Sequence, residues 1–251
     1  MNIQALRRQV AETSRRVWEK GWVANHDGNI TVRVDGGRLL ATPTAVSKGA
    51  IREEDVLLLD GGTGAVIAGN GRPFSELYMH QEIYGARPDV TAVIHAHPPV
   101  LCSFAVAGIE VEPSIMAEPV VSLGSRIPLA PTVLPGSIQA KQQLRALATL
   151  FDVILLGNHG PVAAGTDLEQ AYLRLELAEH VADIQQRAIW LGGVRRIPDR
   201  FLEPLLQSRK KAGLGPAARG PVPPGTPSLE DASVEDLVRA LVEDVSGSAS
   251  S

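Results

Sequence analysis

Four segments of the chain carry hydrophobic residues and boundary signals that predict helices. In residues 3–20 the hydrophobic side chains recur every three or four positions, which places them on one face of a helix that Gly21 ends. Further helices are predicted over residues 75–87, 138–150 and 166–191. The last is the longest, and Thr166 followed three residues later by Glu169 predicts a capping box at its start.

Short runs of hydrophobic and β-branched residues predict strands between these helices. The expected strands cover residues 29–34, 38–42, 56–59, 65–68, 91–97 and 152–156. Gly36-Gly37 indicates a hairpin between the first two, and scattered Pro and Gly predict loops with short strands over residues 113–136. Short strands first and a mixture of elements later favour α/β or α+β layering, and no internal repeat is visible.

The composition changes after about residue 212. A Gly/Pro-rich segment, GLGPAARGPVPPGTP, predicts a disordered linker. Beyond it, hydrophobic residues between Val234 and Val245 return to helical spacing, and Ser233 is a suitable N-cap. We expect one folded domain over residues 1–212 and a flexible tail over residues 213–251, whose short helix either docks on a neighbouring subunit or stays loose.

Composition and charge narrow the class of protein. The 251 residues carry a net charge of -4, with 44% hydrophobic and 21% charged residues, which is typical of a soluble globular protein. Mild acidity argues against bulk electrostatic binding of nucleic acid. The single cysteine, Cys102, excludes an intrachain disulfide framework and fits a reducing compartment. No membrane-spanning run is present in the sequence, so we expect a cytoplasmic protein.

The pair His95 and His97 is the first candidate for metal chemistry. Because side chains alternate along a strand, both imidazoles leave the same face, about 6 to 7 Å apart at their Cα atoms. That span suits two ligands of one cation. The alternative is a pair of half-buried histidines that hydrogen-bond to neighbouring backbone.

His159 and Glu76 extend this candidate site. His159 lies in the turn Gly157-Asn158-His159-Gly160 after a buried strand, where α/β folds often expose functional groups. Glu76 opens the helix that leads to the His95 strand; its alternative role is to complement the helix dipole. Three imidazoles and one carboxylate suit a divalent cation such as zinc. His80, one turn beyond Glu76, is interpreted as a structural residue that could also support the site.

A second group of small polar residues could bind an anion. Backbone amides and hydroxyls can hold a phosphate or carboxylate without a dedicated positive charge, and each residue could equally be an ordinary turn residue. The members are Gly28, Asn29, Thr31, Thr42-Pro43-Thr44, Ser75 and Lys48. No Walker-type loop or dinucleotide fingerprint is present in the sequence.

Together these motifs resemble the class II aldolase/adducin family. Gly28-Asn29-Ile30-Thr31, Thr42-Pro43-Thr44, Ser75-Glu76, His95-Ala96-His97 and Asn158-His159-Gly160 stand in that family's order, over roughly residues 3–200. The pattern is most similar to fuculose-phosphate aldolases, with ribulose-phosphate 4-epimerases in the same family. The resemblance implies a three-layer α/β/α sandwich with a central, mostly antiparallel sheet, assembled as a homotetramer.

The resemblance also implies roles for individual residues. It implies one divalent cation per subunit, most often Zn²⁺ with Mn²⁺ or Fe²⁺ as alternatives, held by His95, His97 and His159. Glu76 would ligate the resting metal and act as acid or base when substrate displaces it. The positions Gly28, Asn29, Thr44 and Ser75 would line a phosphate pocket.

Three features depart from the family pattern. Phe74 stands where the family often has a first serine, and Ala45 stands where a glycine often follows the threonine. Aldolase relatives use a tyrosine from a neighbouring subunit as proton donor, whereas this chain has tyrosines only at Tyr78, Tyr84 and Tyr172.

The sequence therefore predicts a metal-dependent lyase that cleaves a carbon–carbon bond of a sugar phosphate or related keto compound through an enediolate. The alternatives are a decarboxylase of a keto acid or a 4-epimerase on the same scaffold, because all three reactions stabilise an enolate with a metal. A third alternative is a non-catalytic, adducin-like interaction module.

Overall fold

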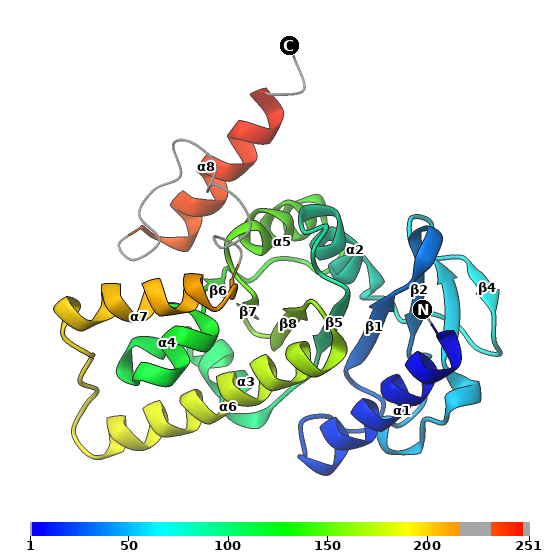
Figure 1. Cartoon of the computed structure of the whole chain (residues 1–251), viewed down its shortest axis with the longest axis horizontal. Helices are drawn as coiled ribbons and strands as arrows, with labels where there is room; N and C mark the ends of the chain where they lie inside the picture. The colour runs from blue at the N-terminus through cyan, green and yellow to red at the C-terminus, as the bar shows by residue number, and fades with distance from the viewer. Residues whose placement is uncertain (1, 216–231, 248–251) are drawn as a thin grey trace.

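A computed structural model describes residues 2–215 and 232–247, and it is built around one sheet (Figure 1). The strand order is β4-β3-β2-β1-β5-β8-β7-β6. The strands are β1 (Asn29–Arg33), β2 (Arg38–Ala41), β3 (Leu57–Asp60), β4 (Val66–Ala68), β5 (Ala92–His95), β6 (Leu129–Ala130), β7 (Val153–Leu156) and β8 (Pro161–Gly165). All neighbours pair antiparallel except β6 and β7, so the expected mostly antiparallel sheet is confirmed.

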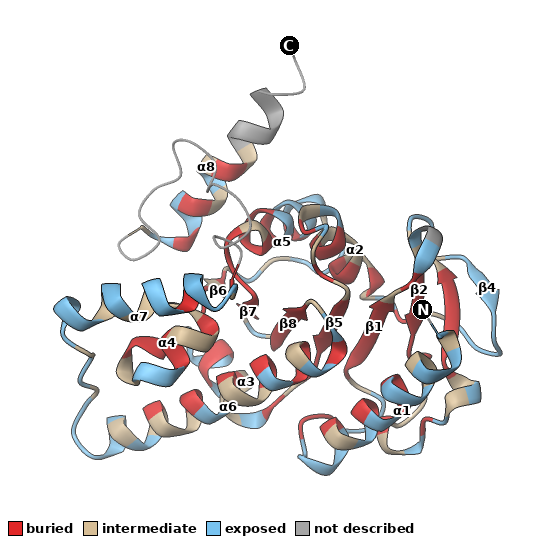
Figure 2. Cartoon of the chain, in the orientation of Figure 1, coloured by how far each residue is buried: buried red, intermediate tan, exposed pale blue. Residues whose placement is uncertain are grey.

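Helices cover both faces of this sheet. They are α1 (Ile3–Glu19), α2 (Leu77–Ala86), α3 (Pro99–Ala107), α4 (Ala117–Leu123), α5 (Ile138–Leu150), α6 (Leu168–Trp190), α7 (Asp199–Lys211) and α8 (Val234–Gly247). One hydrophobic cluster joins α1, α3 and α6 to one face of the sheet, and a second joins α2, α5 and α8 to the other. The predicted three-layer α/β/α sandwich is thus confirmed, and its most deeply buried strands are the central ones (Figure 2).

Alternation along β1 and β5 decides which residues meet in each layer. Ile30 and Ile94, paired across the two strands, point into the first cluster, whereas Val93 points into the second. Thr31, opposite Val93, faces the α2 side, where it meets polar residues of that helix. A polar position in the middle of a buried strand therefore opens toward α2.

Local capping explains where two helices begin. Asn2 caps α1 by accepting hydrogen bonds from the amides of Gln4 and Ala5. At α6 the capping-box prediction was wrong by one residue: Asp167, not Thr166, is the N-cap and accepts from the amide of Gln170. Glu169 is free for another partner, and it pairs with Arg16 of α1.

Three helices and one strand were not predicted. Residues 113–136, expected as loops with short strands, contain α4, and α3, α7 and β8 were assigned no element. Proline is compatible with the first turn of a helix, and Pro99 stands there in α3, so a proline does not by itself indicate a loop. Strand β8 consists of Pro, Val, Ala and Gly and lacks the polar alternation of a half-buried strand because it is buried along its length.

A buried ion cluster ties α7 to the body of the molecule. Asp152, with a fully buried side chain, lies 3.1 Å from Arg87, 2.9 Å from Arg174 and 2.7 Å from Arg209. These arginines come from the end of α2, from α6 and from α7. One carboxylate thus holds three elements that are far apart in the sequence.

The predicted C-terminal helix is present as α8, and Ser233 accepts a hydrogen bond from the Asp236 amide as expected of an N-cap. It packs on α5 of its own chain, with Val234, Leu237 and Leu241 buried. Most of the predicted linker lies outside the described residues, and the division of the chain at residue 212 stays a prediction.

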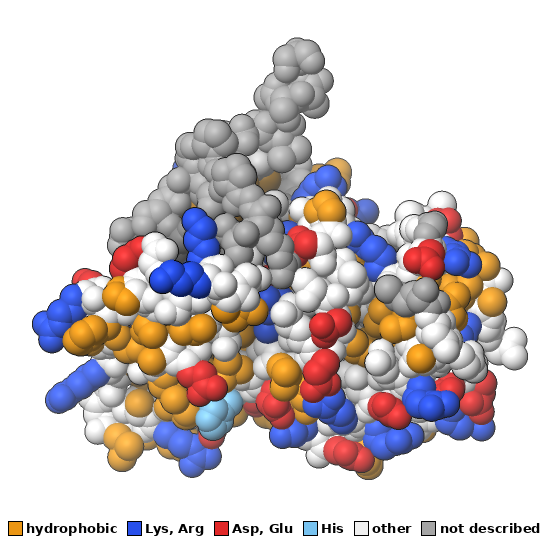
Figure 3. All heavy atoms as spheres, in the orientation of Figure 1, with side chains coloured by type: hydrophobic (Ala, Val, Ile, Leu, Met, Phe, Trp, Pro, Cys, Tyr) orange, Lys and Arg blue, Asp and Glu red, His pale blue; other side chains and the backbone are white. Residues whose placement is uncertain are grey.

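The surface mixes charges of both signs. Acidic and basic side chains are interspersed over the face in Figure 3, and apolar side chains gather where α7 packs beside α4. Among the helices within residues 2–215 and 232–247, none is long and apolar enough to cross a membrane.

Candidate functional site

The end of β5 places two histidines side by side. His95 is the last residue of the strand, and the chain then turns so that the His97 amide donates to the carbonyl of Trp22 at 2.7 Å. Helix α3 follows at once, and Glu179 of α6 accepts hydrogen bonds from its first free amides, at Val100 and Leu101. His97 is therefore anchored on both sides.

The turn between β7 and β8 supplies the third histidine. Asn158 adopts the left-handed conformation there, with φ 56°, and its side chain accepts a hydrogen bond from Thr132 at 2.6 Å. Because β8 pairs with β5, with His95 opposite Val162, the turn that precedes β8 carries His159 to the end of β5.

The three predicted histidines form one cluster. Each of His95, His97 and His159 offers a ligand nitrogen, and these atoms lie within 4.8 Å of one another. Ring centroids are 4.6 to 5.2 Å apart, and the Nε2 atoms of His95 and His97 are 3.0 Å apart. The geometry brings together residues that lie more than sixty positions apart in the sequence.

The hydrogen bonding of His95 prepares it to act as a ligand. Its Nδ1 lies 2.9 Å from the carbonyl oxygen of Pro161, which can only accept, so Nδ1 carries the proton and Nε2 presents a lone pair. Burial lowers the pKa of His95 well below its usual value and so keeps the ring neutral.

This donor set fits a divalent cation. With zinc–nitrogen bonds of about 2.0–2.1 Å, tetrahedral ligand atoms are about 3.3 Å apart. The 3.0 Å separation of two imidazole nitrogens is close to that value, and a third imidazole and a carboxylate stand beside them. Neutral imidazoles and a carboxylate are suitable ligands for zinc, and also for iron or manganese.

Glu76 faces the histidine cluster from the start of α2. It occupies the N-cap position, and its Oε1 lies 2.9 Å from Nε2 of His159 while its Oε2 lies 3.7 Å from Nε2 of His95. Burial would raise the pKa of Glu76, but hydrogen bonds from His159 and Asn29 outweigh it and lower the pKa. The group is therefore held as a carboxylate.

A line of hydrogen bonds runs from Glu76 into the α2 layer. The Asn29 amide nitrogen donates to Glu76 at 2.8 Å, and the Asn29 oxygen lies 2.6 Å from Nε2 of His80. On the other side of that ring, Nδ1 lies 2.7 Å from the hydroxyl of Thr31, which in turn lies 2.9 Å from the hydroxyl of Tyr84. His80 thus supports the site through Asn29, whose side-chain nitrogen and oxygen both form hydrogen bonds.

The remaining residues of the predicted phosphate pocket lie around this cluster. Gly28 adjoins β5 so closely that a Cβ would come 3.0 Å from the His95 carbonyl oxygen. The Thr44 amide donates to the carbonyl of Arg72, which places its loop beside the segment that leads to the exposed Ser75. The structure brings these positions to the same end of the sheet as the histidines.

Lys48 serves the backbone rather than a surface ligand. It is only 2% exposed, and its Nζ donates to the carbonyls of His26 and Val46 at 3.0 and 3.1 Å. Burial lowers the pKa of Lys48 to about 8. Its place is beneath the loop that carries Gly28.

Backbone strain concentrates in the loops around the site. Within the described part of the chain, the non-glycine residues with positive φ are Asn25, Ala45 and Asn158, with values of 51°, 60° and 56°. Each lies in a loop that carries a predicted site residue, respectively Gly28, Thr44 and His159. Such conformations cost about 1–3 kcal/mol each and are typical of functional loops.

The sequence alone did not single out several groups that shape the site. The Asp27 carboxylate lies 3.6 Å from Nδ1 of His97, and the carbonyls of Pro161 and Trp22 orient His95 and His97. An acidic residue immediately before Gly28 was the one available signal. The backbone carbonyls had none, because any residue type supplies them.

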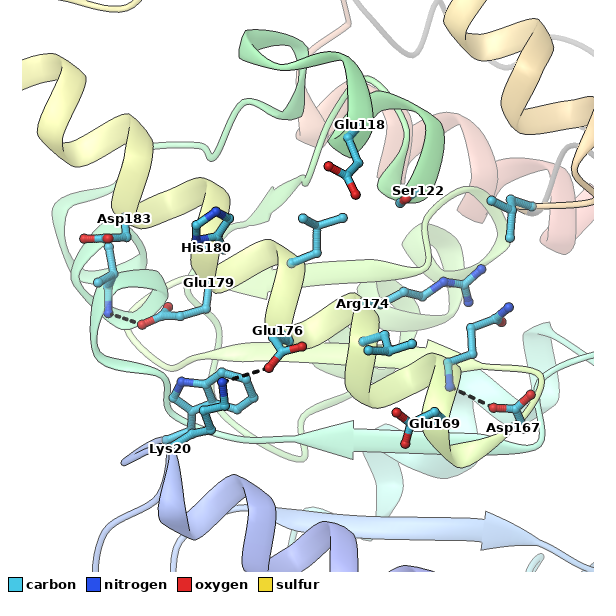
Figure 4. Close-up of a pocket in the computed structure, with 16 residues that line it drawn as sticks. Lys20, Glu118, Ser122, Asp167, Glu169, Arg174, Glu176, Glu179, His180 and Asp183 are labelled. Carbon is cyan, nitrogen blue, oxygen red and sulfur yellow. Dashed lines mark hydrogen bonds and ion pairs between the residues drawn. The ribbon is translucent and has the colours of Figure 1, made fainter.

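A separate cavity of about 980 Å³ lies along α6 (Figure 4). Acidic residues outnumber basic ones in its lining, and they are Glu118, Asp167, Glu169, Glu176, Glu179 and Asp183. It contains none of the three clustered histidines. Glu179 links the two places, since this residue lines the cavity and holds the start of α3 after His97.

Comparison with known proteins agrees with this architecture. Residues 8–186 match the family model described as "Class II Aldolase and Adducin N-terminal domain". The chain belongs to the class II aldolase and adducin family. The family resemblance expected from the motifs is thereby confirmed.

Proteins named for two different activities are similar to this chain at about the same level of sequence identity. A 3-oxo-tetronate 4-phosphate decarboxylase of Pectobacterium atrosepticum is 28% identical over 77% of this chain and 88% of its own length. An L-fuculose phosphate aldolase of Methanococcus maripaludis is 31% identical over 67% of this chain and 89% of its own. The structure of YgbL from Klebsiella pneumoniae superposes with a TM-score of 0.73 at 26% identity, covering 82% of this chain and 99% of that one.

Proposed function

We propose that the chain is a metal-dependent lyase that cleaves a carbon–carbon bond of a sugar phosphate or related keto compound. The observation that carries the proposal is the convergence of His95, His97 and His159 within 4.8 Å, with Glu76 hydrogen-bonded to that cluster. A non-catalytic module would have no need of three imidazoles and a carboxylate gathered at one point.

The chain's own residues divide the work. His95, His97 and His159 would hold a divalent cation, which acts as a Lewis acid and lowers the barrier to forming a negatively charged enolate by several kcal/mol. Glu76 would move a proton to or from the substrate carbon or hydroxyl, a contribution of about 10²- to 10⁴-fold for a well-placed group. Asn29 orients that carboxylate through its 2.8 Å hydrogen bond.

Aldol cleavage and decarboxylation remain two candidate reactions. Both reactions break a carbon–carbon bond near a carbonyl and leave an enolate. Aldol cleavage must also remove a proton from the hydroxyl that becomes the aldehyde carbonyl. The similarity to the decarboxylase of Pectobacterium atrosepticum, over 88% of that protein, favours the second reaction. The similarity to the aldolase of Methanococcus maripaludis favours the first. Epimerisation through a retro-aldol step would use the same groups.

We also propose an anion pocket, a metal, an assembly and a location for this enzyme. Gly28, Asn29, Thr44 and Ser75 would surround the phosphate or carboxylate of the substrate, with backbone amides and hydroxyls in place of a cationic side chain. We propose zinc as the cation, a homotetramer as the assembly and the cytoplasm as the location.

The first experiment measures metal content. Wild-type protein and His97→Ala, each loaded with zinc and dialysed, are compared by elemental analysis, with exposed His26→Ala as the matched control. We expect about one zinc per chain in the wild type and the control and much less in His97→Ala, since loss of one of three imidazoles removes much of the affinity. Equal zinc in all three proteins would refute the site.

The second experiment identifies the reaction. L-fuculose phosphate and 3-oxo-tetronate 4-phosphate are incubated with the zinc-loaded protein, and aldehyde and carbon dioxide are assayed separately. Glu76→Gln should retain the fold and lose rate by at least about 100-fold. Release of carbon dioxide without aldehyde would replace the aldolase reading with the decarboxylase reading, and neither product from any related substrate would argue for an interaction module.

A further inference from the structure

We propose that Thr31 and His80 are positioning residues that fix the orientation of the Asn29 amide, so that its nitrogen and not its oxygen faces Glu76. The proposal rests on the proposed function of Glu76 as the proton carrier. It concerns the line Tyr84, Thr31, His80, Asn29 and Glu76, whose successive polar atoms lie 2.9, 2.7, 2.6 and 2.8 Å apart.

The direction of every hydrogen bond along this line follows from its end at Glu76. A carboxylate only accepts, so Asn29 must present its NH₂ to Glu76 and its oxygen to His80. His80 must then carry its proton on Nε2 and accept at Nδ1. Thr31 is the donor to that Nδ1, which leaves its oxygen to accept from Tyr84.

Packing alone does not select this orientation of the Asn29 side-chain amide. Its oxygen and nitrogen are nearly equal in size, so a rotation of 180° about the last bond fits the same space. In the rotated form a carbonyl oxygen would face the carboxylate of Glu76, and an NH₂ would face the N–H of His80. The unrotated form is therefore selected from both sides, by the carboxylate of Glu76, which only accepts, and by His80 when its Nε2 carries the proton.

Burial makes this selection strict. The exposed fractions are 3% for Asn29 and 0% for Thr31 and His80. Bulk water therefore cannot form a hydrogen bond with a mismatched donor or acceptor there. Burial also lowers the pKa of His80 to about 3, which keeps the ring neutral and leaves it with one N–H. Thr31 supports the Nε2–H tautomer by donating its single proton to Nδ1 while its oxygen accepts from Tyr84.

A purely structural role for His80 is the competing explanation. Its ring lies 5.1 Å from the ring of Phe74, so it also fills space in the α2 layer. The two roles separate in a Thr31→Val variant, because valine keeps the volume of threonine and leaves His80 and Phe74 in place. The hydrogen bonds of the Thr31 hydroxyl to Nδ1 of His80 and to Tyr84 are lost, and Tyr84 keeps the carbonyls of Thr31 and Thr91 as acceptors.

The test combines a spectrum with kinetics. Long-range ¹H–¹⁵N NMR of the histidine rings reads which nitrogen of His80 is protonated, with the resonance assigned by its loss in His80→Phe. Thr149→Val is the matched control, because it removes a hydroxyl bonded to the Ala146 carbonyl on α5. Turnover is measured with whichever of L-fuculose phosphate and 3-oxo-tetronate 4-phosphate the wild type accepts.

We expect Nε2–H in wild type and Thr149→Val, and a mixture of the two tautomers in Thr31→Val. In the latter, kcat should fall about tenfold with zinc content unchanged, as is typical for groups behind a metal-associated residue. Thr31→Ser should restore both the tautomer and kcat.

Two results would overturn the inference. One is a wild-type His80 protonated at Nδ1, which needs no variant to observe. The other is a Thr31→Val protein with the wild-type tautomer and kcat within twofold of the control. The spectrum is recorded on protein without substrate, so it stands apart from the proposed reaction, which fails instead if Glu76→Gln keeps its full rate.

Discussion

His80 should make the fold sensitive to mild acid. The ring is completely buried, and burial lowers its pKa from 6.5 to about 3 in the native state. In the unfolded chain the ring regains an ordinary pKa near 6.5. Between these two values the unfolded state binds a proton that the native state does not, so the free energy of unfolding falls as the pH falls.

The size of the effect follows from the two pKa values. Each pH unit between about 6 and 4 costs about 1.4 kcal/mol, and lowering the pH from 7 to 5 costs about 2 kcal/mol through this one residue. Above pH 6.5 His80 is neutral in both states and lowers the free energy of unfolding by nothing. The loss of stability reaches its limit of about 5 kcal/mol near pH 3, where the native state also binds the proton. A typical domain has only about 5–15 kcal/mol in total.

Urea unfolding of wild type and His80→Phe at pH 7, 6 and 5, with EDTA present to remove metal, isolates this effect. Every other titrating group, His95 included, is common to both proteins and cancels in the comparison. The variant should be less stable at pH 7, because Asn29 and Thr31 lose a partner, but its stability should fall less steeply, with the gap narrowing by about 2 kcal/mol by pH 5. Parallel curves of unfolding free energy against pH would refute the reasoning.

Three further predictions follow from packing and charge. Asp152→Asn leaves three buried arginines without their shared carboxylate and should destabilise the protein by about 3–5 kcal/mol in urea unfolding, whereas Asp183→Asn in an exposed pair should leave the midpoint unchanged. Gly28→Ala forces a side chain at φ 72° against the His95 carbonyl and should weaken zinc binding at least about tenfold by titration; wild-type affinity would contradict the tight packing. Leu237→Ala should cost about 2–5 kcal/mol by thermal unfolding if α8 is part of the core, and an unchanged midpoint would show that α8 contributes nothing.

The sequence predicted the framework where a periodic pattern had a clear boundary. Helix α5 was predicted with the bounds that the structure has, and the structure shows Ser137 as its N-cap and Phe151 as its C-cap. Helix α3 was missed because its residues are mostly apolar and its N-cap position is Pro98, so neither an amphipathic face nor a capping side chain was visible. Helix α4 was missed within a stretch whose prolines and glycines predicted loops.

The histidine cluster was foreseeable in part for a different reason. The spacing of His95 and His97 and the turn around His159 can be recognised in the sequence. The resemblance to the family, whose motifs stand in the same order, predicted that these residues form one site. The link from Thr31 through His80 to Asn29 was not, because it depends on β1 and α2 facing each other across the second layer. Asn29 was expected to contact phosphate, and only the fold shows that its amide also joins Glu76 to His80.

The strained residues Asn25, Ala45 and Asn158 bear on how this protein can change in evolution and in the laboratory. Glycine at any of the three would relieve the backbone and could raise native stability, but it would also widen the range of conformations open to a loop that positions the site. Selection for heat resistance and selection for turnover should therefore pull these positions in opposite directions. A library varied only at Asn25, Ala45 and Asn158 would trace that trade-off directly.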